Sequence, residues 1–129
     1  MKLETIKSTL TGLLKDQAYF AILFGSVVTP YFRDDSDIDL AVFLKEPPEN
    51  IDDQIAFYEQ FEGILPRKVD IVILNSSDII ITMQVLQTGE LLFNIDPERY
   101  YRFVVQKLAE YPDFKRSRKV IEDQLMKVE

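Results

Sequence analysis

Aspartates stand near the start of two short hydrophobic segments, and this pattern constrains the fold more than any other feature of the sequence. Residues 37–44 read DIDLAVFL and residues 68–74 read KVDIVIL. Successive side chains of a β-strand point to opposite faces, so Asp37 and Asp39 share one face. The same test separates Asp70 from the valine and isoleucine on either side of it. If the two strands are neighbours in matched register, three carboxylates converge on one face of a sheet.

Alternating strand and helix patterns surround these segments. Aromatic and β-branched runs predict two further strands, at residues 18–24 and 90–93. Apolar residues at helical spacing predict helices over residues 2–17, 51–64, about 78–87 and from 97 onward, with a short helical turn at 27–32. We therefore expect a single α/β domain over residues 1–129. It should hold a small mixed sheet of three to four strands, with helices packed mainly on one face and the carboxylates on the other.

The C-terminal segment, residues 97–129, reads as helical throughout. A straight helix of roughly 30 residues would be about 45 Å long, against a radius of gyration of about 14 Å for a chain of this size. The helix therefore either kinks at Pro112 or projects. This segment holds eight Lys or Arg against six Asp or Glu, whereas residues 1–96 hold seven against sixteen. Two readings follow: a solvated helix that wraps its own domain, or a helix that binds a partner.

Composition excludes several kinds of chemistry. The 129 residues include no Cys and no His, and 15 Lys plus Arg against 22 Asp plus Glu give a net charge of -7. Thiol nucleophiles, imidazole bases and the usual zinc sites are therefore absent. A metal should be a hard cation on oxygen ligands. The acidic balance disfavours nucleic acid as a partner. The N-terminus does not resemble a signal peptide and no run of about 20 apolar residues occurs, so we expect a cytoplasmic protein away from membranes.

Three clustered carboxylates favour a metal site. Two carboxylates roughly 6.5 Å apart repel by about 2.5 kcal/mol at an effective dielectric of about 20. Mg²⁺ reverses the sign of this interaction, because it binds one or two carboxylates together with substrate phosphates, and paired ions can clamp an in-line phosphoryl displacement. A remaining carboxylate can accept the proton of an attacking hydroxyl. Gly25 and Ser26, where the first strand ends and a helical turn begins, offer free backbone N–H groups and a hydroxyl to a phosphate. The indicated chemistry is nucleotidyl or phosphoryl transfer.

Each of these motifs also has a purely structural reading. Gly25-Ser26 can be a turn, the paired aspartates can cap a loop, and Asp70 can simply pair with Lys68. The joint occurrence of all three motifs, with the carboxylates at matching positions, favours the catalytic reading.

The same residues resemble a known superfamily. Gly25-Ser26, ten intervening residues, Asp37-Ile38-Asp39 and then Asp70 in a hydrophobic strand resemble the nucleotidyltransferase superfamily of DNA polymerase beta. The short length and the VDIVILN…LLFN…DF course resemble its minimal nucleotidyltransferases, the MntA-like antitoxins encoded beside HEPN-domain toxins. Many relatives carry a Gly a few residues after the Gly-Ser pair, whereas this chain reads VVTPYFR with Pro30. The course of this loop, and any contact of Arg33 with ATP, are left open by that departure.

The resemblance implies a function and roles for the residues. Gly25 and Ser26 would hold the triphosphate of ATP. Asp37 and Asp39 would bind Mg²⁺, with two ions expected, and Asp70 would complete the metal site and activate the acceptor hydroxyl. Members of the family transfer AMP from ATP to a tyrosine hydroxyl of the partner toxin and so silence its ribonuclease activity.

Two alternatives stay open beside this function. One is adenylylation of a small molecule such as an aminoglycoside, which usually needs a further domain to hold the acceptor. The other is a non-catalytic antitoxin that acts by complex formation alone, with the C-terminal helix as its docking element. The tyrosines near the tail fit a helix surface or core better than a modification site; they are Tyr100, Tyr101 and Tyr111.

Overall fold

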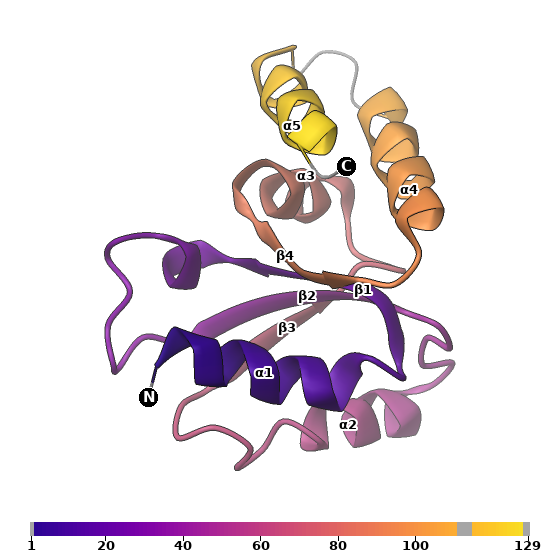
Figure 1. The fold of residues 1–129 in the computed structure, drawn as a ribbon. Helices are drawn as coiled ribbons and strands as arrows, with labels where there is room; N and C mark the ends of the chain where they lie inside the picture. Colours follow the sequence, from indigo (N-terminus) through magenta and orange to yellow (C-terminus); the bar gives the residue numbers. More distant parts are fainter. Residues whose placement is uncertain (1, 111–114, 128–129) are drawn as a thin grey trace.

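A four-stranded mixed sheet lies between two layers of helices (Figure 1). The computed structural model describes residues 2–110 and 115–127, with side chains for residues 2–110 and 119–126. The strands, in the spatial order β3-β2-β1-β4, are β1 (Ala18–Phe24), β2 (Ile38–Leu44), β3 (Val69–Ile73) and β4 (Glu90–Asn94). β1 pairs antiparallel with β2 and β4, and β2 pairs parallel with β3. The predicted α/β fold with a small mixed sheet is confirmed.

Five α-helices and one short 3₁₀ turn are described along the chain. They are α1 (Leu3–Leu14), η1 (Gly25–Val28), α2 (Ile51–Glu59), α3 (Ile79–Thr88), α4 (Pro97–Glu110) and α5 (Lys115–Lys127). Among these, η1 follows β1 directly at Gly25–Val28, earlier than the helical turn predicted at residues 27–32. Asp78 caps the start of α3, because its side chain accepts a hydrogen bond from the Ile81 N–H at 3.0 Å and satisfies a free donor of the first turn.

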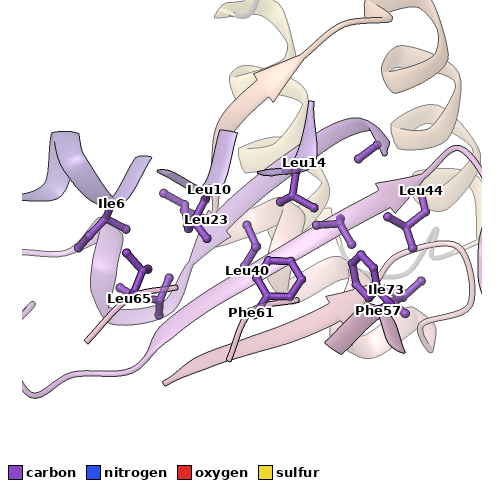
Figure 2. Close-up of a cluster of buried hydrophobic side chains, with 14 of the residues drawn as sticks. Ile6, Leu10, Leu14, Leu23, Leu40, Leu44, Phe57, Phe61, Leu65 and Ile73 are labelled. Atoms are coloured by element: carbon purple, nitrogen blue, oxygen red, sulfur yellow. The ribbon is translucent and has the colours of Figure 1, made fainter. Parts of the chain in front are cut away.

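The first helical layer, α1 and α2, covers one face of the sheet. Its apolar cluster joins the buried side of α1 to alternate residues of the strands and to the aromatic residues of α2 and the turn after it (Figure 2). The residues labelled in Figure 2 are Ile6, Leu10, Leu14, Leu23, Leu40, Leu44, Phe57, Phe61, Leu65 and Ile73. These side chains form the first of two hydrophobic cores among the described residues.

The second layer, α3 to α5, covers the opposite face, which differs from the expectation of helices mainly on one face. The reason lies in β1, where Ala21 and Leu23 point into the first core and Phe20 and Ile22 point into the second. A strand that is apolar on both faces has to be covered on both. The Phe20 ring stacks on Phe43 with centroids 5.0 Å apart, which anchors this second core.

The carboxylates consequently do not lie on a face free of helices. Asp39 alternates with Ala41 and Phe43 along β2, and these two side chains pack in the second core. Asp39 therefore lies on the face that carries α3 to α5, at the end of β2 away from Phe43. The helices α3 to α5 cover the part of β2 that carries Ala41 and Phe43. The start of β2, with Asp39, lies beside η1.

The C-terminal segment forms two helices in place of one. α4 ends at Glu110 and α5 begins at Lys115, while Pro112 and Tyr111 lie outside the described residues. Ile121 of α5 is buried in the second core, so α5 packs on its own domain beside α3 (Figure 1). This position supports the first of the two readings of the segment, a helix that wraps its own domain.

The positions of Tyr100 and Tyr101 agree with the predicted structural role of the tail tyrosines. The Tyr100 ring packs edge-on against Phe20, with centroids 4.9 Å apart, and the Tyr101 side chain is exposed on the surface of α4. Within residues 2–110 and 115–127, no helix is long and apolar enough to span a bilayer.

Candidate active site

The turn after β1 brings the backbone of Gly25 against the Asp39 side chain. Gly25 has φ +72°, a left-handed conformation that suits glycine. A Cβ added here would collide with Oδ2 of Asp39 and lie 3.0 Å from its Cγ. The Ser26 carbonyl accepts hydrogen bonds from the Thr29 N–H at 3.0 Å and the Thr29 hydroxyl at 2.8 Å, which shapes the turn. The Ser26 hydroxyl has no hydrogen-bond partner among the described residues, so it is available to a ligand.

The register of β2 and β3 places two of the predicted carboxylates side by side. Asp39 and Asp70 are direct partners in the parallel pair, and adjacent strands lie about 4.8 Å apart. The Ile38 N–H donates to the Lys68 carbonyl at 2.9 Å and extends the pairing to the start of both strands. The matched register of neighbouring strands, on which the sequence argument depended, is therefore present. Asp37 lies one residue before β2 and is exposed.

Electrostatics connect the three carboxylates. Burial raises the pKa of Asp39 above its usual value, and the negative charges of Asp70 and Asp37 raise that pKa further. The same charges that repel one another would stabilise a cation placed between them. This repulsion, which comes after burial among the causes of the raised pKa, indicates that the acidic end of β2 and β3 suits a positively charged ligand.

The donor set fits Mg²⁺ as a partial site. Within the described part of the chain, no group of three or more carboxylates is arranged to hold a metal ion by itself. Mg²⁺ commonly takes only one or two protein carboxylates, and substrate phosphates and water complete its octahedron. Asp39 and Asp70 on adjacent strands supply such a pair, with phosphates expected from the side of Gly25 and Ser26.

Asp70 also forms an ion pair with Lys68, as the purely structural interpretation of Asp70 predicts. The Lys68 ammonium lies 3.3 Å from Oδ1 of Asp70, with the two side chains 71% and 45% exposed. Exposed pairs of this kind contribute little to stability. The pair therefore does not explain why Asp70 faces Asp39, and Lys68 neutralises part of the local negative charge.

Arg67 is a residue of this region that the sequence patterns did not indicate. Its guanidinium donates to the backbone carbonyls of Arg33 and Ser36, just before Asp37. The contact joins segments about 30 residues apart in the chain, and no local pattern signals such a pairing. The Arg33 side chain is exposed.

The family of the chain follows from a comparison with known families. The sequence pattern described as "Polymerase beta, Nucleotidyltransferase" matches residues 4–98. The chain belongs to this nucleotidyltransferase family, and the matched range includes all five predicted site residues. A search of curated proteins found no match.

Several solved structures of similar fold are described as toxin–antitoxin complexes. A chain in the crystal structure of a toxin–antitoxin with AMP-PNP is 26% identical, with a TM-score of 0.72 over 93% of this chain and 98% of that chain. A chain of the toxin–antitoxin MntA-HepT is 25% identical, with a TM-score of 0.67 over 95% and 98%. A third structure, of a tri-AMPylated Shewanella oneidensis HEPN toxin in complex with an MNT antitoxin, shares the fold at 24% identity, with a TM-score of 0.70 over 97% and 99%.

Proposed function

We propose that this protein is an antitoxin that transfers AMP from ATP to a tyrosine hydroxyl of a partner HEPN-type ribonuclease toxin and thereby neutralises it. The observation that carries the proposal is the Asp39–Asp70 pair on adjacent strands, with the backbone of Gly25 packed against Asp39. Membership of the nucleotidyltransferase family supports the reaction class. The similar chains in toxin–antitoxin structures, one of them with an ATP analogue, support the partner and the nucleotide.

The proposed roles divide the site between substrate binding and proton transfer. The backbone at Gly25 and the Ser26 hydroxyl bind the triphosphate of ATP. Asp37, Asp39 and Asp70 hold Mg²⁺, with two ions expected, and the metal supplies charge neutralisation at the phosphates. In the transfer, the tyrosine oxygen forms a bond to the α-phosphorus and the bond to the pyrophosphate oxygen breaks. Asp70 accepts the tyrosine proton.

The remaining parts of the proposal concern place and partners. Because the reaction consumes ATP, we place the protein in the cytoplasm, and we propose neither a nucleic acid nor a membrane as its partner. Because α5 packs on its own domain, we propose the transfer reaction, and not docking through this helix, as the basis of neutralisation.

The experiment combines the protein with ATP, Mg²⁺ and the HEPN-domain protein encoded beside it. Mass spectrometry of that partner should show added AMP groups. Asp39→Ala should abolish the addition, whereas Asp35→Ala, at an exposed position upstream of β2, should not. Full neutralisation of the partner by Asp39→Ala would instead establish an antitoxin that acts by complex formation. If the neighbouring gene encodes no HEPN-like protein, a small-molecule acceptor becomes the better explanation.

A further inference from the structure

Arg67 connects the start of β3 to the loop that precedes β2. Its Nη1 donates to the Arg33 carbonyl at 3.1 Å and to the Ser36 carbonyl at 3.3 Å. The guanidinium also stacks on the Phe32 ring, with Cζ 4.7 Å from the ring centroid. Three contacts thus fall within the five residues before Asp37, all made by one side chain.

The loop that Arg67 holds is closed on itself. The Arg33 N–H donates to the Ser36 hydroxyl at 3.0 Å, and the Ser36 N–H donates to the Arg33 carbonyl at 3.1 Å. That carbonyl therefore accepts from two donors, one in the loop and one on Arg67. Phe32 packs against the first hydrophobic core, so the loop is fixed to the body of the domain on one side and to Arg67 on the other.

This arrangement opposes a repulsion within the site. The negative charges of Asp70 and Asp37 act on Asp39, and β3 is a strand of only five residues at the edge of the sheet. Like charges at the starts of two paired strands favour separation of those ends. Arg67 precedes Asp70 by three residues and binds the backbone directly before Asp37, so it holds together the two segments that carry the carboxylates.

We propose that Arg67 is a positioning residue of the active site, which sets the distance of Asp37 and Asp39 from Asp70. Only the expected effect of Arg67 on the reaction rate rests on the proposed nucleotidyl transfer. A planar guanidinium can donate to two carbonyls while stacking on a ring, and a lysine ammonium cannot reproduce this combination. No hydrogen bond joins Arg67 to a carboxylate among the described residues, so its effect passes through the backbone that it holds.

The test compares Arg67→Lys with Arg99→Lys. Arg99 is a matched control, because it also stacks on an aromatic ring, Tyr19, at 4.1 Å and makes a hydrogen-bonded ion pair, with Asp96, but it lies on α4. In Arg67→Lys, hydrogen exchange at the Ser36 and Ile38 amides should accelerate about tenfold, as loss of one hydrogen bond to a charged group implies. The kcat of AMP transfer should fall by about the same factor, with the KM for ATP nearly unchanged. Arg99→Lys should alter neither.

The outcomes separate this proposal from the proposed function. If the wild-type protein transfers no AMP, the proposed function fails, and amide exchange alone decides the role of Arg67. Unchanged exchange at Ser36 and Ile38, or an equal loss of kcat in Arg99→Lys, would overturn the proposal. Phe32→Leu serves as a second variant should Arg67→Lys not fold. It removes the stacking surface but keeps both hydrogen bonds, and a smaller change in the same direction is expected.

Discussion

At the scale of single residues, Gly25 and Gly63 both have positive φ, but only Gly25 lies against an active-site side chain. Comparing their alanine variants therefore distinguishes the cost of backbone strain from the cost of a collision with Asp39. Gly25 has φ +72° and Gly63 has φ +73°. A Cβ at Gly25 meets the Asp39 carboxylate, whereas a Cβ at Gly63 has no atom within 4 Å. Gly63→Ala should therefore lose only about 1–2 kcal/mol of unfolding free energy, the cost of a left-handed alanine.

Gly25→Ala should lose more than Gly63→Ala and should also displace the Asp39 side chain. Urea unfolding of the two variants measures the difference in stability. The AMP-transfer rate of Gly25→Ala should fall, because the added Cβ moves the Asp39 carboxylate away from the turn. Equal losses of stability in the two variants would show that the close approach of Gly25 to Asp39 has no energetic weight.

Because the pKa of Asp39 is raised, removing its charge should increase the stability of the folded protein, and the size of this increase should depend on pH. Burial is the main cause of the shift, followed by Asp70 and Asp37, so the folded state disfavours the ionised carboxylate. The resulting destabilisation is absent below the unfolded-state pKa of about 3.9 and appears as pH rises through the higher folded-state pKa. Asp39→Asn should therefore unfold at a higher urea concentration than wild type at about pH 7, and this gain should vanish at about pH 3.

The same urea unfolding experiment is repeated with added Mg²⁺. Added Mg²⁺ should stabilise the wild-type protein at neutral pH more than Asp39→Asn, since a cation that binds the folded state shifts its stability by mass action. Asp35→Asn, at an exposed position, is the matched control and should behave as wild type in both arms. A loss of stability in Asp39→Asn at neutral pH would contradict the assigned direction.

At the scale of secondary-structure elements, the Asn75 side chain continues the pairing of β3 with β2 beyond the last residue of β3. Its Oδ1 accepts from the Leu44 N–H at 2.8 Å, and its Nδ2 donates to the Leu44 carbonyl at 3.0 Å. Asn75→Ala should cost about 1–3 kcal/mol of unfolding free energy, because partly buried backbone groups lose their partner. Ser76→Ala, at the exposed neighbouring position, should change stability by less than about 0.5 kcal/mol. Thermal unfolding of the two variants decides the point.

Individual elements show which parts of the structure the sequence can predict. Alternation along β2 and β3 placed Asp39 and Asp70 on one face, and the observed register agrees, because side-chain parity is a local property of each strand. The helices on the second face of the sheet were not predicted, since their packing against the strands joins distant parts of the chain.

The contacts of Asn75 and Arg67 were not predicted, for the same reason. Each side chain binds backbone about 30 residues away in the chain, and an isolated Asn or Arg in a loop gives no sign of its partner. The residues that hold β2 and β3 together, Asn75 at one end and Arg67 at the other, are thus harder to recognise in the sequence than the residues proposed to do the chemistry.

At the scale of the whole molecule, α5 decides whether the C-terminal segment belongs to the domain or to a partner. Ile121 is 3% exposed in the second core, whereas Met126 of the same helix is 73% exposed. The Gln124 side chain also donates to the Gln87 carbonyl of α3 at 3.1 Å. An integral helix therefore predicts that Ile121→Ala costs about 2–5 kcal/mol of unfolding free energy, and that Met126→Ala costs less than about 0.5 kcal/mol.

Urea unfolding of the isolated protein measures both changes without a partner. If α5 bound only to a partner, the two variants would unfold together with wild type, and their effects would emerge only in the complex. A loss confined to Ile121→Ala places α5 within the cooperative unit that supports Phe20 and Phe43, since these side chains share its core. In that case truncation of the helix would also weaken the sheet that carries Asp39, and a loss of antitoxin activity on truncation would not by itself identify a partner-binding surface.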